Sequence, residues 1–377
     1  MLGREGNMSL HKNPRVRYAV VGLGHIAQVA VLPGFENARK NSELVAFVSG
    51  DPVKRERVGR RYQVINTCTY REYGALLKSG AIDAVYIALP NNMHRDFAVR
   101  AAQAGIHVLC EKPLAPTEKD CRAIIAACAK NNVKLMTAYR LHFERANLEA
   151  IAIAQSGRLG ELRIFNSVFG FQVRDGNIRT QKKMAGGPSY DIGIYCINAA
   201  RYLFRDEPME VKAYTLRTDK RFHGVEAISS AMLLFPNNRI ASFTCSFDSA
   251  DAGSYTVLGT KGKLQLDMAY EYAGDSSMEV TIGGKKERRS YKQRDQFGAE
   301  LTYFSDCVLR HRDPEPSGQE GLADVRVIEA IFKSARTGKA VTIPKMRKAK
   351  YPSKQQEIWH PAVEEPPLVN VKSGSRD

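Results

Sequence analysis

The stretch VRYAVVGLGHIA, residues 16–27, is the strongest indication of the fold in this sequence. Its first six residues are mainly β-branched and apolar, which predicts a buried strand, and the residues after the glycines are expected to form a helix. Gly22 would make a tight turn, Gly24 would let the backbone approach a pyrophosphate, and Ala27 would allow close packing of helix on strand. This order predicts a dinucleotide-binding site at a helix N-terminus. A glycine-rich turn that binds no ligand is the alternative.

From this motif to Arg140, strand-like and helix-like segments alternate. Strands are expected at 44–48, near Val64, and at 84–89, 106–110 and 133–138, and helices at 52–62, 70–79, 94–104 and 117–131. Alternation with short connections predicts a doubly wound parallel sheet, whose strands end at the ligand site. The candidate residues at those strand ends are Ser49, Leu89, Pro90, Asn91, Asn92, Glu111, Lys112, Pro113, Tyr139 and Arg140.

The end of the second strand indicates which cofactor is used. Sites that prefer NAD usually carry Asp or Glu there, to accept a hydrogen bond from the ribose 2′-hydroxyl. This chain has Ser49, with Lys54 and Arg55 just beyond. A small hydroxyl and nearby cations suit a 2′-phosphate, which a carboxylate would repel. We therefore predict NADP, with NAD as the alternative if Asp51 reaches back to the ribose.

After Arg140 the pattern changes to a helix at 144–156, an alternating strand at 162–169, and five strands between 209 and 268 separated by short turns. Consecutive strands of this kind predict an open, mainly antiparallel sheet, closed by helices at 297–310 and 320–336. We expect an α/β protein with a flexible arm (1–14), a Rossmann domain (15–140), an α+β substrate-binding and oligomerisation domain (141–344), and a polar, Pro-rich tail (345–377). The tail is expected to be poorly ordered.

The stretch GGPSYDIGIYCINAARYLF, residues 186–204, opens with a loop signal and continues at helical spacing. Asp191 and Tyr195 are four residues apart, so they share one face of the expected helix and can point into a cleft. A purely structural interpretation is also open, in which Asp191 caps the helix and Tyr195 packs in the core.

Together these motifs resemble the Gfo/Idh/MocA oxidoreductase family, and within it the branch of the glucose–fructose oxidoreductase type. The resemblance covers about residues 17–341 and is carried by Gly22-Leu-Gly24, Glu111-Lys-Pro113 and Asp191-Ile-Gly-Ile-Tyr195. It implies that Lys112, Asp191 and Tyr195 are catalytic. Most of the wider family has His at the place of Tyr195, and a Trp-Arg pair is replaced here by Ile178-Arg179.

The resemblance and the strand ends give two sets of candidate binding residues. Those expected to bind the cofactor are Gly22, Leu23, Gly24, His25, Ile26, Ala27, Ser49, Gly50, Lys54, Leu89, Pro90, Asn91, His94, Glu111, Lys112 and Arg140. Those expected to contact substrate are Tyr139, His142, Asp191 and Tyr195. For Tyr139 and His142, packing with a backbone hydrogen bond is the alternative.

The expected chemistry is hydride transfer to or from a nicotinamide, with Tyr195 accepting a proton from a sugar hydroxyl and returning it in reduction. A tyrosine hydroxyl is a poor base near neutral pH unless a cation stabilises the phenolate. We expect Lys112 within reach of the Tyr195 hydroxyl or of the substrate oxygen, and Asp191 to orient Lys112 or the sugar.

Composition excludes several other classes of protein. The net charge of +16 is spread in local basic runs without aromatic interleaving, which favours surface charge and a phosphorylated cofactor over nucleic acid. The sequence contains no run of about 18 apolar residues, so we expect no membrane span. The seven cysteines form no CxxC pair, which argues for reduced thiols in a cytoplasmic protein and against a metal site.

The sequence therefore predicts an NADP-dependent oxidoreductase acting on an aldose or polyol, with coupled oxidation of one sugar and reduction of another as an extension. A non-catalytic NADP-binding regulator of the same fold and a dihydrodiol dehydrogenase are the alternatives. The resemblance implies a homo-dimer or homo-tetramer formed through the second sheet.

Overall fold

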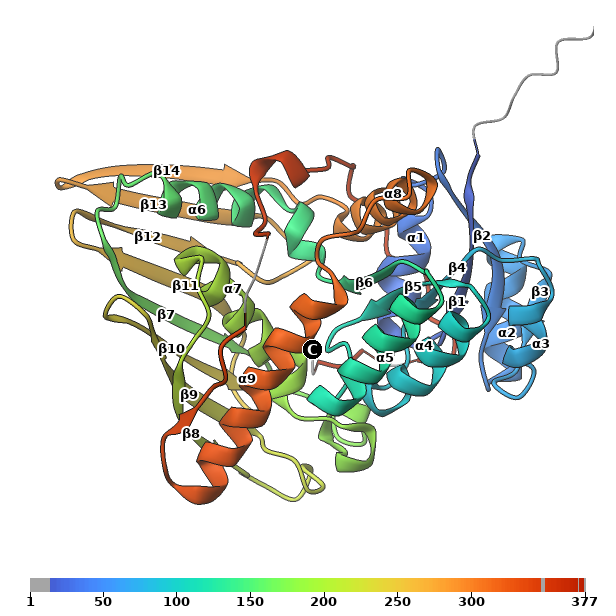
Figure 1. The fold of residues 1–377 in the computed structure, drawn as a ribbon, viewed down its shortest axis with the longest axis horizontal. Helices are drawn as coiled ribbons and strands as arrows, with labels where there is room; N and C mark the ends of the chain where they lie inside the picture. Colours follow the sequence, from blue (N-terminus) through green and yellow to red (C-terminus); the bar gives the residue numbers. More distant parts are fainter. Residues whose placement is uncertain (1–13, 347–349, 372, 376–377) are drawn as a thin grey trace, which may run out of the picture.

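The computed structural model describes residues 14–346, 350–371 and 373–375. Two β-sheets stand apart from each other, and helices pack on each of them (Figure 1). Nearly all of the arm expected at residues 1–14 lies outside the described residues. Among the helices described, none is both long enough and apolar enough to cross a bilayer.

The first sheet has six parallel strands in the order β3-β2-β1-β4-β5-β6. They are β1 (Val16–Val21), β2 (Ser42–Val48), β3 (Asn66–Cys68), β4 (Ala84–Ile87), β5 (His107–Glu111) and β6 (Leu135–Ala138). The strand order reverses between β1 and β4, which is where ligands bind in sheets of this kind. The predicted doubly wound parallel sheet is confirmed.

Helices connect these strands close to the predicted positions. They are α1 (Leu32–Gly34), α2 (Pro52–Tyr62), α3 (Tyr73–Lys78), α4 (His94–Gln103) and α5 (Glu118–Lys130). Asp51 caps α2 by accepting from the backbone N–H groups of Val53 and Lys54, and Thr117 caps α5 in the same way. Such caps satisfy donors that the first turn of a helix leaves unpaired.

The second sheet has nine strands in the order β14-β13-β12-β11-β7-β10-β9-β8-β15. They are β7 (Leu162–Gly170), β8 (Glu210–Leu216), β9 (Ile228–Phe235), β10 (Arg239–Ser246), β11 (Ala252–Gly259), β12 (Gly262–Asp267), β13 (Ser276–Ile282), β14 (Lys285–Tyr291) and β15 (Val341–Thr342). Every pair is antiparallel except β7 with β10, so the mainly antiparallel sheet is confirmed.

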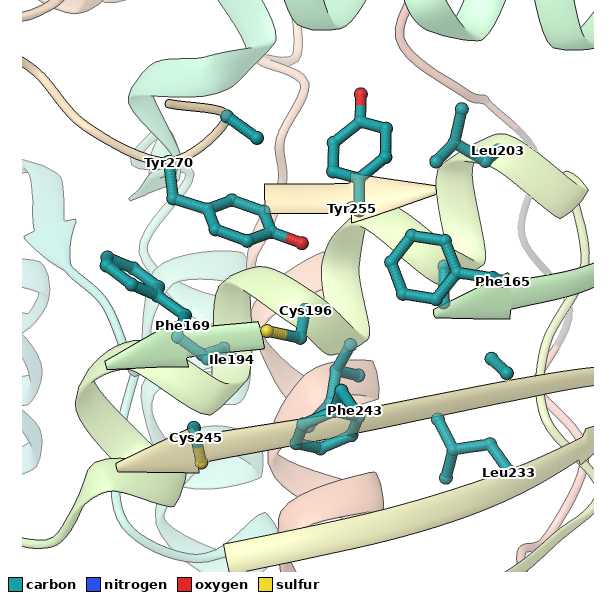
Figure 2. Close-up of a cluster of buried hydrophobic side chains, with 14 of the residues drawn as sticks. Phe165, Phe169, Ile194, Cys196, Leu203, Leu233, Phe243, Cys245, Tyr255 and Tyr270 are labelled. Carbon is teal, nitrogen blue, oxygen red and sulfur yellow. The ribbon is translucent and has the colours of Figure 1, made fainter. Parts of the chain in front are cut away.

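Helices α6 (Arg145–Gln155), α7 (Ile194–Phe204) and α9 (Gly318–Thr337) cover one face of this sheet (Figure 1). Figure 2 shows the core beneath α7, where Cys196 and Ile194 meet Phe165, Phe169 and Phe243 of the strands. Helix α8 (Gln296–Leu309) was expected to close this second domain. It packs instead on the first sheet, where the Ser305 hydroxyl lies 2.7 Å from that of Tyr18.

The expected poor order of the tail is wrong for its described residues. The red segment after β15 returns to the region between the two sheets (Figure 1). Backbone atoms of Ile358 and Pro361 form hydrogen bonds with Phe143 and Asn37, and Val369 is 1% exposed. Most of these contacts use backbone groups, so they leave no apolar periodicity in the sequence. The domain boundaries at residues 140 and 344 stay predictions.

Candidate active site

A cavity of about 700 Å³ lies between the two sheets, at the carboxyl ends of β1, β2, β4 and β5. Both halves of the chain line it. The first half contributes, among others, Gly22, Leu23, Gly24, His25, Ile26, Ser49, Lys54, Leu89, Pro90, Asn91, Glu111, Lys112 and Arg140. The second half contributes, among others, Phe169, Arg179, Asp191, Tyr195, Asp251, Glu271 and Tyr272.

The two glycines of the first turn serve different purposes. Gly22 has a φ of +97°, and a Cβ added there would meet the carbonyl oxygen of Ala88 at 2.5 Å, so the fold itself requires glycine. A Cβ added at Gly24 would meet no atom within 4 Å, although Gly24 lines the cavity. The space beside Gly24 is therefore open to a ligand, and the turn fits the pyrophosphate of a dinucleotide.

The residues after β2 favour NADP over NAD. Ser49, Lys54 and Tyr70 line the cavity, and Ser49 is buried. Asp51 is committed to capping α2, because its Oδ1 accepts from Val53 N at 2.9 Å and from Lys54 N at 3.1 Å. Its Oδ2 accepts from the Asn370 amide at 3.3 Å. Asp51 therefore has little freedom to accept from a ribose hydroxyl, which the NAD alternative requires.

Asp191 lies between two cations. Lys112 Nζ donates to the Asp191 carbonyl oxygen at 2.8 Å and to its Oδ1 at 2.7 Å, and Arg179 Nε donates to its Oδ2 at 2.5 Å. Burial alone would raise the pKa of Asp191, but the charges of Arg179 and Lys112 hold that pKa well below its ordinary value. Burial lowers the pKa of Lys112, and the negative charge of Asp191 raises it. The outcome is a pKa above the ordinary value of a lysine. All three groups therefore stay charged near neutral pH.

Tyr195 has a different cationic partner from the one expected. Arg140 Nε donates to the Tyr195 hydroxyl at 3.1 Å, whereas Lys112 Nζ lies over the ring, 5.0 Å from its centroid. Arg140 also donates to the carbonyl oxygen of Tyr270 and to the side chain of Gln296, which fix its guanidinium. The predicted positive charge beside Tyr195 is present, but the hydrogen bond comes from Arg140.

Helix α7 is positioned by a buried ion cluster. The Arg201 guanidinium bonds Asp324 at 2.5 Å and Glu320 at 2.6 Å, both on α9, and also bonds Glu207 at 2.6 Å. A π-helical turn, Ser189–Gly193, precedes α7 and carries Asp191. Such turns occur frequently at functional sites. Asp191 and Tyr195 both line the cavity, as their four-residue spacing predicted, so the alternative of a helix cap and a core tyrosine is not what the structure shows.

Tyr139 and His142 do not line the cavity, which corrects their expected contact with substrate. The Tyr139 hydroxyl donates to Asp324 Oδ2 at 2.5 Å, and His142 Nε2 lies 2.5 Å from the Tyr202 hydroxyl. A 3₁₀ turn, Arg140–Phe143, follows β6, and with about three residues per turn its successive side chains point in different directions. Only Arg140 of this turn reaches the cavity.

Three residues expected at the cofactor also lie outside the cavity lining: Ala27, Gly50 and His94. Ala27 is buried at the start of the first helical turn, in keeping with its expected packing role. Both ring nitrogens of His94 are engaged by backbone carbonyls, Nδ1 with Pro113 at 2.9 Å and Nε2 with Leu89 at 2.8 Å. Burial lowers the pKa of His94. His94 thus supports the two cavity-lining loops from behind.

Several lining residues carry no sequence signal that would have found them. They come from the second sheet and the chain end, and include Phe169, Asp251, Glu271, Tyr272, Ser373, Gly374 and Ser375. Arg179 differs from these residues because the sequence did give a signal for it. It stands in the loop before Gly186-Gly187, where Ile178-Arg179 takes the place of the Trp-Arg pair. Among the described residues, no group of three His, Cys, Asp or Glu side chains is placed to hold a metal ion.

One cavity is lined by a glycine turn at the switch point of the first sheet and by the charged side chains of Lys112, Asp191 and Arg179. This combination is typical of an oxidoreductase that uses a nicotinamide dinucleotide. Residues 16–139 match the oxidoreductase family with an NAD-binding Rossmann fold, and residues 148–265 match the GFO/IDH/MocA C-terminal domain. The chain belongs to the Gfo/Idh/MocA oxidoreductase family, as its motifs predicted.

Three relatives illustrate this membership. D-xylose 1-dehydrogenase (NADP(+)) 2 of Haloferax volcanii is 32% identical over 86% of this chain and 99% of its own length. The structure of aldose-aldose oxidoreductase from Caulobacter crescentus, complexed with glycerol, is 39% identical with a TM-score of 0.83, covering 87% of this chain and all of that one. KijD10, a 3-ketoreductase from Actinomadura kijaniata solved with NADP and TDP-benzene, is 25% identical with a TM-score of 0.79, covering 85% and 98%.

Proposed function

We propose that this chain is an NADP-dependent sugar oxidoreductase in which Tyr195 moves the proton and Lys112 and Asp191 organise the substrate oxygen. The observation that carries the proposal is the hydrogen bond from Arg140 to the Tyr195 hydroxyl. Next to it, Asp191 is bonded to both Lys112 and Arg179. All five residues line the same cavity as the glycine turn. Two of the relatives named above carry a sugar substrate in their names, D-xylose and aldose, and the D-xylose enzyme also carries NADP(+) in its name. The predicted cofactor and sugar chemistry agree with them.

The residues that would hold NADP are those of the first half of the cavity. The turn from Gly22 to Ile26 suits the pyrophosphate, and Ser49 with Lys54 suits the 2′-phosphate. Leu89, Pro90, Asn91, Glu111, Lys112 and Arg140 complete this wall. When bound there, NADP would supply the hydride chemistry, the oxidation of a carbinol carbon or the reduction of a carbonyl carbon.

Tyr195 would take the proton of the sugar hydroxyl during oxidation. The Arg140 guanidinium, 3.1 Å from the Tyr195 hydroxyl, stabilises negative charge on the phenolic oxygen. In reduction the same hydroxyl returns its proton to the sugar oxygen, as general acid. Arg140 therefore supplies the positive charge beside the Tyr195 hydroxyl that was expected from Lys112 alone.

Lys112 would face the oxygen of the substrate. Its amine stays protonated because Asp191 accepts from it, and a fixed cation near an oxygen that gains negative charge stabilises that charge. Asp191 in turn is held by Arg179, so the direction of the Lys112 amine is fixed from behind. This gives Asp191 an orienting role rather than that of a base, since its own pKa is far too low.

We also propose that the chain forms a homo-dimer or homo-tetramer through the outer face of the second sheet. Apolar side chains lie exposed on four neighbouring strands of that face: Ile164, Val168, Tyr214, Leu216, Met232, Leu234 and Ile240. A contiguous apolar face of this kind marks an interaction surface. Native mass spectrometry of the wild type and of Met232→Lys tests it, and a monomeric wild type would contradict it.

A cytoplasmic location is proposed as well, because all seven cysteines are free thiols. Alkylation of the purified protein without reductant is expected to label seven thiols once it is unfolded. A disulfide found in that experiment would contradict the proposal.

The function is tested by assaying NADP and NAD reduction with a panel of aldoses, polyols and a cyclic trans-diol. We expect turnover with NADP and an aldose, and a large loss in Tyr195→Phe. Preference for the cyclic diol would favour the dihydrodiol alternative. Cofactor binding without turnover on any member of the panel would favour the regulator.

A further inference from the structure

Residues 367–371 and 373–375 return to the cavity and contact both of its sides. Ser373, Gly374 and Ser375 line the cavity together with the glycine turn and with Lys112, Asp191 and Tyr195. We propose that these residues form a strap that closes over the bound dinucleotide and slows its release.

The first part of the strap is fixed to the nucleotide-binding sheet. Val369 is 1% exposed, and its backbone is paired in both directions with the Gln28 amide: Val369 N donates to Oε1 at 2.8 Å, and Nε2 donates to Val369 O at 3.0 Å. The same Gln28 amide donates to the carbonyl oxygen of Leu23, within the glycine turn. One buried side chain therefore joins the strap to the loop expected to hold the pyrophosphate.

Two further contacts extend this attachment toward the ribose end. Asn370 donates to Asp51 Oδ2 at 3.3 Å, next to Ser49, and Arg61 donates to the carbonyl oxygen of Pro367 at 2.8 Å. The strap thus runs along the residues expected to hold the adenosine 2′-phosphate.

The last part of the strap is attached to the opposite side of the cavity. Arg174 donates from its backbone N to Gly374 O at 3.0 Å and from Nε to Ser375 O at 2.5 Å. Val173 and Ser375 face each other in an isolated antiparallel bridge. A Cβ added at Gly374 would meet the Arg179 guanidinium at 2.5 Å, so the strap passes directly against the cation that holds Asp191.

A segment that is attached at both ends, and whose last residues line the cavity, must detach before a large ligand can leave past it. This inference rests on the proposed function, because the ligand whose release the strap slows is the NADP that the cavity is proposed to bind.

The test measures cofactor release rather than activity. NADPH bound to the full-length protein is displaced with excess NADP, and the loss of its fluorescence is followed. Val369→Asn puts an amide where the buried anchor stands, without adding charge. Ala362→Asn introduces the same amide at an exposed position earlier in the tail and is the control. We expect release to be at least about tenfold faster in Val369→Asn, since burial of a valine side chain corresponds to one to two factors of ten in an equilibrium constant. Ala362→Asn should release NADPH like the wild type.

A second variant tests the other end. Val173→Cys combined with Ser375→Cys places two thiols in the antiparallel bridge, so that oxidation locks the strap down. Release should slow by at least about tenfold on oxidation and recover with reductant, because an opening step is removed. Equal release rates in wild type and Val369→Asn, or no effect of the cross-link, would overturn the strap. Absence of turnover in a protein that still shows these release rates would instead overturn the proposed function and leave the strap standing.

Discussion

Arg140 Nε lies 3.1 Å from the hydroxyl of Tyr195 and donates a hydrogen bond to it. Arg140 follows β6 of the first sheet, and Tyr195 stands on α7 against the second, so this pair joins the two halves of the chain at the cavity. Because Tyr270 and Gln296 hold the guanidinium, the hydroxyl has a fixed cation beside it before any substrate binds. A preorganised charge of this kind is what proton transfer through a tyrosine requires.

Replacing Arg140 by methionine is expected to lower kcat/KM for sugar oxidation. The variant loses the hydrogen bond that the guanidinium donates to the Tyr195 hydroxyl at 3.1 Å, and loss of a hydrogen bond involving a charged group corresponds to roughly ten- to hundredfold in rate. The measurement is kcat/KM with a single aldose. Arg140→Lys, which keeps a charge, should lie between Arg140→Met and the wild type. An unchanged kcat/KM in Arg140→Met would remove Arg140 from the proton path.

Ser49→Glu is expected to reverse the cofactor preference. A carboxylate beside Lys54 would repel the 2′-phosphate of NADP and could accept from the ribose hydroxyl of NAD. Loss of a charge-assisted contact corresponds to roughly ten- to hundredfold in affinity for NADP. Fluorescence titration with NADPH and NADH measures both affinities. Lys54→Ala should weaken NADPH binding alone, and equal weakening of both cofactors would argue against this phosphate site.

The two glycines of the first turn should respond oppositely to alanine. Gly24→Ala puts a methyl group into open cavity space, so stability should hold while dinucleotide affinity falls. Gly22→Ala forces a side chain at φ +97° against the Ala88 carbonyl, so it should lower the melting temperature by several degrees, as a loss of about 1–3 kcal/mol does. Calorimetry with and without NADP separates the two effects. Equal dinucleotide affinity in Gly24→Ala and wild type would place the pyrophosphate elsewhere.

Asp191→Asn is expected to destabilise the protein in a pH-dependent way. It leaves Lys112 and Arg179 without their shared carboxylate, which costs about 3 kcal/mol for a buried pair. The pKa of Asp191 is depressed in the folded chain, so its contribution is present above the unfolded value of about 4 and is lost as the pH falls toward the folded one. The gap in melting temperature should therefore be largest near pH 7 and shrink below about pH 4. Asp313→Asn, which breaks an exposed pair with Lys134, should change little at either pH.

The parts of the fold with a strong local period were predictable. The expected helix at 52–62 coincides with α2, and the expected strand at 16–21 coincides with β1. The hairpin of β13 and β14 was not expected, because β14 reads KKERRSY, and its mostly exposed charges hide the alternation that a half-buried strand shows. At the edge of a sheet such charges are expected, since they prevent pairing with other chains.

In the candidate site, only the residues that belong to a sequence motif or to a strand end could be predicted. The spacing of Asp191 and Tyr195 placed both at the cavity, and the strand-end rule placed Ser49, Glu111 and Lys112 there. The partner of Tyr195 could not be deduced, because the choice between Lys112 and Arg140 depends on side-chain directions after β5 and β6. The strap was missed for a related reason: its hydrogen bonds use backbone atoms, which any residue possesses.

The most direct test of the central claim is transfer of label from an aldose deuterated at C1 to NADP, followed by mass spectrometry of the NADPH formed. We expect deuterated NADPH from the wild type, and a rate lower by about 10²- to 10⁴-fold in Tyr195→Phe with NADPH affinity unchanged, because general acid–base catalysis contributes that much. Unlabelled NADPH, or an undiminished rate in Tyr195→Phe, would contradict the assignment of Tyr195 as the group that moves the proton in sugar oxidation.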